Sequence, residues 1–208
     1  DTIQPPPDVH DDERRIHRLN DLSPARLREL RRESTLRPHD LAASLGIPEA
    51  ALVAAELGHG VTRIDPAPGR LIPLVEALGE VMALTRNRSC VIEKIGTYRE
   101  FHDGAHAAMT LDDEIDLRIF PRHWVHGFAV EAQGKDGIRR SVQVFDAAGD
   151  AVHKIHLRKG SDLDAWAALT AALALPEQSA PDHYPPRATP EGARIVPERA
   201  DTLRSEWA

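Results

Sequence analysis

Arg118 and eleven histidines are the residues of this chain that could bind a metal ion or an anionic ligand. In the stretch EIDLRIF, residues 114–120, apolar and polar side chains alternate, which predicts a strand with Arg118 on the face opposite the Ile and Leu side chains. The rigid fork of donors on an arginine suits a planar or anionic ligand. Two interpretations stay open: Arg118 binds such a ligand, or it is a solvated arginine paired with Asp116.

The histidine spacings do not predict a metal site. His153 and His156 are three residues apart in a predicted strand, so their rings point to opposite faces of the sheet. His123 and His126 have the same spacing and the same difficulty if that segment is extended. The two histidines of HDGAH, residues 102–106, would share one face of a helix, but the Asp-Gly pair between them predicts a turn. No metal site and no catalytic residue is therefore assigned.

Composition excludes several classes of protein. With 208 residues, of which 41% are hydrophobic, the chain can bury a normal core. A net charge of −7 argues against a surface that binds nucleic acid or anionic membranes. The single cysteine, Cys90, excludes an internal disulfide, fits a reducing cytoplasm and is predicted to be a core residue of a strand. No apolar run is long enough for a membrane span, so we expect a cytoplasmic protein.

Three segments differ in their pattern. Residues 1–65 are predicted to form a mostly helical cap. Residues 66–175 begin with a short amphipathic helix and continue as β-branched runs that predict an antiparallel meander, closed by a helix that Ser161 caps with Asp164 as its capping-box partner. Residues 176–208 are predicted to be a Pro-rich linker and the start of a truncated next domain. The fold class is α+β, a helical segment followed by a large antiparallel meander sheet packed with helices.

The stretch DLAASLGIPEAALVAAELG, residues 40–58, has the spacing of a helix-turn-helix, with Gly46 at the turn. A recognition helix needs side chains that reach bases or phosphates, whereas PEAALVAAEL offers two glutamates and no cation. The stretch therefore favours a structural helix pair over a DNA reader. For the DNA alternative, the cations would have to come from the preceding helix, from Arg28, Arg31 and Arg32.

Four stretches occur in the order of motifs from a known family. PHDLAASLGIPEAAL, TRNRSCVIEKIGTY, DLRIFPRHW and SVQVFDAAGDAVHKIH resemble motifs of the bacterial haemin-degrading or haem-trafficking factors, the HemS/ChuS/PhuS-like proteins. The resemblance covers nearly the whole chain. It implies the N-terminal half of a tandem structural repeat, in which haem lies in a cleft between sheet and helices.

The resemblance also implies roles for single residues. The distal arginine of the family falls on Arg118. The family's proximal haem-ligating histidine follows a tryptophan that matches Trp207, so it would lie beyond Ala208. Within this chain, the substitute haem ligands would be His59, His102 and His106. The competing interpretation is that all three are surface or structural residues.

The function implied is that of a cytoplasmic protein that binds b-type haem after bacterial haem uptake and carries it or supports its degradation, in iron acquisition. Its implied partners are a haem oxygenase or the haem importer. The sequence has no flavin or nicotinamide motif, so an enzyme of this kind would need an external reductant, and a carrier role is the expectation. The alternatives are a DNA-binding regulatory module and a scaffold half that forms a homodimer through its unpaired sheet.

Overall fold

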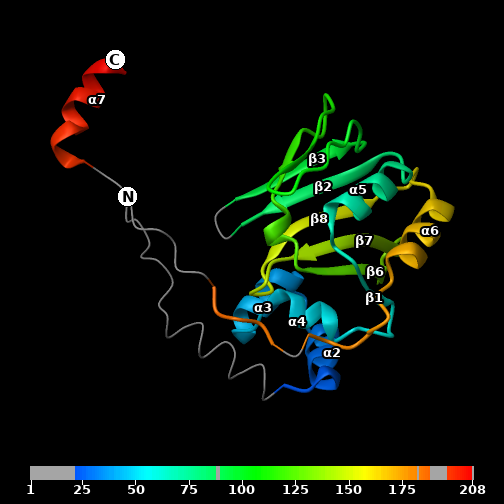
Figure 1. The fold of residues 1–208 in the computed structure, drawn as a ribbon. Helices are drawn as coiled ribbons and strands as arrows, with labels where there is room; N and C mark the ends of the chain where they lie inside the picture. Colours follow the sequence, from blue (N-terminus) through cyan, green and yellow to red (C-terminus); the bar gives the residue numbers. More distant parts are fainter. Residues whose placement is uncertain (1–21, 88–89, 182, 188–195, 208) are drawn as a thin grey trace.

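A computed structural model describes residues 22–87, 90–181, 183–187 and 196–207, and its centre is a six-stranded sheet (Figure 1). The strands of this sheet are β1 (Val61–Ile64), β2 (Val81–Arg86), β3 (Val91–Gly96), β6 (His126–Gly134), β7 (Gly137–Phe145) and β8 (Ala151–Leu157). Their order is β1-β6-β7-β8-β2-β3, and every pairing is antiparallel. The remaining two strands, β4 (Ala108–Thr110) and β5 (Leu117–Ile119), form a separate small sheet.

The α+β fold class is confirmed, and the strand order adds what the sequence pattern did not predict. Strands β6, β7 and β8 form a meander with hairpins at the two predicted turns. Strand β2 comes before them in the chain, yet it pairs with β8, the last strand. Strand β1 lies inside the segment predicted as helical, because four residues of VTRI carry too little periodicity to reveal a strand that forms by pairing with β6.

One face of the sheet is covered by α5 (Pro68–Glu76) and α6 (Leu163–Leu173), as Figure 1 shows. The main core lies between them and the sheet, and the small sheet contributes Ile119 to it. Helix α6 buries Trp166, Leu169 and Leu173, which recur at helical spacing on its inner side. This face holds most of the buried apolar side chains of the described residues, so it supplies the rigid base of the domain.

The predicted cap of α6 is wrong by one residue. Asp162, not Ser161, is the N-cap, and its carboxylate accepts hydrogen bonds from the backbone N–H groups of Asp164 and Ala165. The Ser161 hydroxyl instead donates to the carbonyl oxygen of Glu80 at 2.6 Å. Both residues are good caps by type, and the tertiary contact with Glu80 decides between them.

The opposite face is covered by α3 (Pro38–Leu45) and α4 (Glu49–Ala54), with α2 (Pro24–Glu33) packed outside them (Figure 1). Gly46 ends α3 with φ 65°, the left-handed conformation that the sequence predicts. All six residues of α4 are buried. The helix pair is therefore a docked structural layer. Residues 1–21 of the predicted helical cap lie outside the described residues.

A buried ion pair joins this helical layer to the sheet. The Lys154 ammonium on β8 donates to a carboxylate oxygen of Glu49, the first residue of α4, at 2.5 Å. Only 9% of the lysine side chain and 3% of the glutamate side chain are exposed. Charges this well buried are tolerated only when they are paired, so the pair fixes where α4 sits on the sheet.

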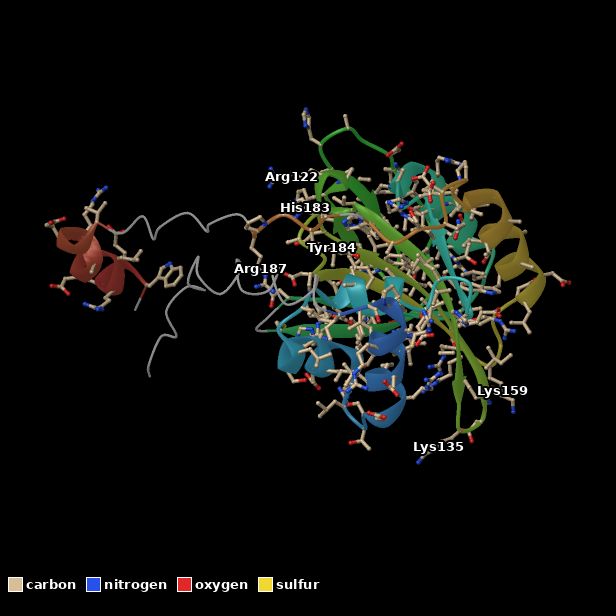
Figure 2. The ribbon with its side chains drawn as sticks, turned by 90° about the horizontal axis from the view of Figure 1, so that it is seen from below. Arg122, Lys135, Lys159, His183, Tyr184 and Arg187 are labelled. Atoms are coloured by element: carbon tan, nitrogen blue, oxygen red, sulfur yellow. The ribbon has the colours of Figure 1, made fainter. Side chains whose placement is uncertain are left out.

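The residues that follow α6 pack back onto the domain. Gln178 exchanges two hydrogen bonds with the backbone of Arg63 on β1, both at 2.8 Å. Tyr184 is buried in the apolar cluster between α4 and the sheet, and Arg187 forms a two-pronged ion pair with Asp150. Figure 2 labels Tyr184 and Arg187 on this segment. The first part of the predicted linker is thus anchored to the domain through three of its described residues, Gln178, Tyr184 and Arg187. Further on, η2 (Pro197–Arg199) and α7 (Ala200–Glu206) form the predicted last helix.

Gly149 permits this close packing. It occupies the hairpin between β7 and β8 with φ 78°, and a Cβ atom there would lie 2.7 Å from both Pro48 Cβ and Tyr184 Cδ1. A side chain at this position would therefore push apart the hairpin, the turn before α4 and the anchored segment.

We expect replacement of Tyr184 by alanine to lower the free energy of unfolding by about 3 kcal/mol, because it empties a buried aromatic site. Urea unfolding followed by circular dichroism measures the change. His183→Ala is the matched control. The His183 side chain, next to Tyr184 in the sequence, is exposed, so its removal should cost less than about 0.5 kcal/mol. Equal effects of the two substitutions would show that residues 176–187 do not contribute to the folded domain.

Candidate functional site

A cavity of about 900 Å³ lies where the two layers of the molecule meet beyond the ends of β2 and β8. One side of it comes from α3, with His39, and from Ile47 in the turn after this helix. The other side comes from β5 and the short helix η1 (Pro121–His123), including Arg118. The apolar part of the wall is formed by Ile47, Leu117, Ile119, Phe120 and Trp124. An apolar hollow with a few polar groups is typical of small-molecule sites.

Arg118 lies on the face of β5 that the alternation predicts. Ile119 and Ile115 are buried, whereas the Arg118 side chain is 52% exposed and lines the cavity. Its guanidinium donates to a carboxylate oxygen of Asp116 at 2.6 Å. An ion pair this exposed contributes only about 0.2–1 kcal/mol, so a ligand in the cavity can replace Asp116 at small cost. The paired state and the ligand-binding state are therefore both accessible to this arginine.

His153 forms the hydrogen-bonded base of the cavity. Its Nε2 lies 2.5 Å from the Tyr98 hydroxyl, and its Nδ1 lies 2.9 Å from the Thr85 hydroxyl. Its ring stacks on Trp124, with 5.5 Å between the ring centroids. Burial lowers the pKa of His153 to about 4, so the ring is neutral near pH 7. Both ring nitrogens are engaged, and the network holds Trp124 in the wall rather than binding a ligand.

The other histidines singled out from the sequence lie elsewhere. His59, His102 and His106 are exposed, and none of them lines the cavity, so their role as haem ligands stays a prediction. His156 lies on the sheet face opposite His153, as the strand alternation predicts. Within the described ranges, no three His, Cys, Asp or Glu side chains are grouped closely enough to hold a metal ion.

Cys90 is exposed, which contradicts its predicted place in the core. The residue precedes β3 instead of belonging to it, and its backbone N–H donates to the Asn87 side chain at 2.8 Å. This bond links the end of β2 to the residue before β3, and the thiol is exposed. The apolar residues that follow Cys90 in the sequence gave a misleading signal, because β3 is an exposed edge strand.

Sequence reasoning missed His39 and its partner. The Nδ1 atom of His39, at the start of α3, lies 3.2 Å from a carboxylate oxygen of Glu49 in α4. The turn at Gly46 separates the two residues, so no helical spacing relates them. Only the fold of the helix pair against the sheet reveals that His39 reaches the cavity.

The burial of the second helix of the pair argues against the DNA-binding alternative. The second helix of the pair, α4, has no exposed residue to place in a groove. Two of the arginines that would supply cations donate to backbone carbonyl oxygens instead, Arg28 to Ala55 and Arg31 to Leu36. In addition, none of the helices in the part of the chain that the structure describes has the length and apolar character needed to cross a membrane.

Comparison with known proteins identifies relatives of this architecture. Residues 46–173 match the family described as the haemin-degrading HemS/ChuX domain. The chain is 37% identical over 169 residues to the hemin transport protein HmuS of Yersinia pestis, covering 81% of this chain and 48% of HmuS. The chain thus spans about half the length of the curated relatives it matches.

Solved structures agree with the sequence match. The fold superposes on holo-PhuS, a heme-binding protein of Pseudomonas aeruginosa, with a TM-score of 0.78 and 40% identity, over 90% of this chain and 56% of PhuS. It also superposes on the heme-degrading enzyme ChuS of Escherichia coli O157:H7, with a TM-score of 0.73 and 27% identity, over 91% of this chain and 54% of ChuS.

We expect stability to fall as the pH drops from about 6.5 to 4, because His153 is neutral in the folded chain and charges when the chain unfolds. Its depressed pKa means that the unfolded state binds the additional proton in this range. The share of His153 in this loss should reach the order of 3 kcal/mol, at 1.36 kcal/mol for each pH unit, and His156, whose pKa burial also lowers to about 4, adds its own share. Urea unfolding across this range measures it. His153→Gln should give a shallower pH dependence, and an equally steep one would rule out His153 as a source.

Proposed function

Because this chain belongs to the family of haemin-degrading HemS and ChuX domains, we propose that it binds haem in the cavity lined by Arg118. The observation that carries the proposal is that a chain matching this family has an apolar cavity lined by both Arg118 and His39. HmuS is named a hemin transport protein and PhuS a heme-binding protein. The same class of ligand is proposed here.

The cavity suits a porphyrin in size and chemistry. Its volume of about 900 Å³ lies at the upper end of the range for small-molecule sites, as a large planar ligand requires. Haem needs apolar side chains around its ring and a nitrogen base on its iron. Leu117, Phe120 and Trp124 supply the first, and a histidine on the wall offers the second. With a single cysteine, the chain lacks the pair that attaches c-type haem, which supports a b-type, non-covalent ligand.

Arg118 is proposed to lie on the distal side of the bound porphyrin. Its guanidinium is always charged and presents several donors, so it can donate a hydrogen bond above the iron once Asp116 no longer occupies it. The distal donors of a haem pocket decide between storage of the haem and activation of oxygen. Arg118 is therefore the residue of this chain through which the fate of the haem is controlled.

The proposed role in the cell is haem carriage. The chain would act in the cytoplasm as one half of a longer protein, accepting haem after uptake and delivering it to a haem oxygenase or supporting its breakdown with an external reductant. Self-association is a further expectation. Strand β3 is the outermost strand of the sheet, and Val91, Ile92 and Ile95 on it are 48%, 64% and 43% exposed.

Ferric haemin titrated into the 208-residue chain should give a saturable Soret band at one haem per chain. We expect Arg118→Ala to shift this band and to speed haem transfer to apomyoglobin about tenfold, because a hydrogen bond from a charged donor contributes about 1.5–3 kcal/mol. Stopped-flow absorption measures the rate of transfer.

Arg99→Ala is the matched control for this substitution. Arg99 is similarly exposed and pairs with an aspartate, Asp112, at 3.7 Å, but it does not line the cavity. Its replacement should leave spectrum and rate unchanged. A linear titration without saturation would overturn the haem-binding proposal, and identical transfer rates for Arg118→Ala and the parent chain would remove Arg118 from the site.

A further inference from the structure

Three histidines line the cavity, His39, His123 and His153, and they differ in which ring nitrogen has a lone pair to offer. A neutral imidazole carries a hydrogen on one nitrogen and a lone pair on the other. Only the nitrogen with the lone pair can bind a metal. The hydrogen bonds around each ring therefore decide which histidine can act as a ligand to iron.

Two of the three are occupied. His153 has a hydroxyl group within hydrogen-bond distance of each ring nitrogen, so neither is available. His123 accepts a hydrogen bond from the Arg122 guanidinium at its Nε2, at 3.0 Å. The lone pair of its neutral ring is therefore on Nε2 and already engaged, and Nδ1 carries the hydrogen.

His39 has the opposite arrangement. Its Nδ1 lies 3.2 Å from Oε2 of Glu49, whose other oxygen accepts a hydrogen bond from the Lys154 ammonium. A carboxylate can only accept, so Nδ1 carries the hydrogen and Nε2 carries the lone pair. A carboxylate behind a histidine is the arrangement that fixes the tautomer and orientation of metal-bound histidines and makes them stronger bases.

The position of His39 suits this role. The side chain is 34% exposed and contributes to the cavity wall. Among the described residues, the ring is hydrogen-bonded to Glu49 through Nδ1. His39 belongs to α3 on one face of the sheet, whereas Arg118 belongs to β5, whose Ile119 packs into the core on the other face. The two residues thus enter the cavity from different layers.

We propose that Nε2 of His39 is an axial ligand of the haem iron in this chain. The inference rests on the proposed haem binding and goes beyond it by naming a ligand that the chain itself supplies. In this arrangement Glu49, held by Lys154, orients the His39 ring, and Arg118 approaches the porphyrin from the other layer.

The test is a titration of ferric haemin into the full 208-residue chain and its His39→Ala variant, followed by Soret absorption and by electron paramagnetic resonance. Removal of the ligand should change the spin state and axial ligation signal and weaken binding at least about tenfold. His39→Met, which offers a thioether instead, should give a third spectrum, distinct from both. His102→Ala, an exposed histidine outside the cavity, should match the parent chain.

Metal-free protoporphyrin IX separates the contribution of iron ligation to affinity from the contribution of contacts with the porphyrin ring. It has no iron to bind, so its affinity, measured by fluorescence, should be equal for the parent chain and His39→Ala. A parent chain that gives no saturable haemin binding would overturn the proposed function. Saturable binding with the same spectrum in His39→Ala would overturn the His39 ligand alone, and so would an equal loss of affinity for haemin and for the metal-free porphyrin.

Discussion

The buried ion pair between Glu49 and Lys154 is the contact on which both the packing and the site depend. It joins α4 to β8 across 105 positions of the sequence, with both charged groups almost fully removed from water. Removing one partner of such a pair costs about 3–5 kcal/mol, because the other charge stays buried without compensation. The pair is therefore weak as a source of net stability but strong as a constraint on position: α4 cannot slide on the sheet without separating the two charges.

This constraint reaches the cavity through neighbouring contacts. The second oxygen of Glu49 lies beside His39, so the position of α4 also sets the position of a side chain on α3. On the same side, Gly149 brings the β7–β8 hairpin against Pro48 and Tyr184. The adjacent Asp150 binds Arg187, and both residues line the cavity. The wall of the cavity that faces α3 is thus fixed by the same contacts that hold the helical layer, including those of Tyr184 and Arg187.

The sequence predicts what periodicity determines and misses what tertiary contacts determine. The orientation of Arg118, the left-handed turn at Gly46 and the fold class follow from local alternation and turn chemistry, and the structure agrees with each. The N-cap of α6 is Asp162 and not the predicted Ser161, because the Ser161 hydroxyl donates to the carbonyl oxygen of Glu80, which is distant in the sequence. Cys90 was misplaced because apolar residues of an exposed edge strand look like those of a core strand. The pairing of His39 with Glu49 needs the fold itself.

The carboxylates that pair with Arg118 and with His39, two residues that line the cavity, have different energetics. The pair of Arg118 with Asp116 is exposed on both sides, so its attraction is screened and can be exchanged for a ligand. The carboxylate beside His39 is buried and already paired, so it stays in place whether or not a ligand is present. A cavity with one fixed and one exchangeable polar wall can hold a metal centre in a constant position while its other side adjusts. In the proposed haem carrier, this combination would allow firm binding of the haem together with its release to an acceptor.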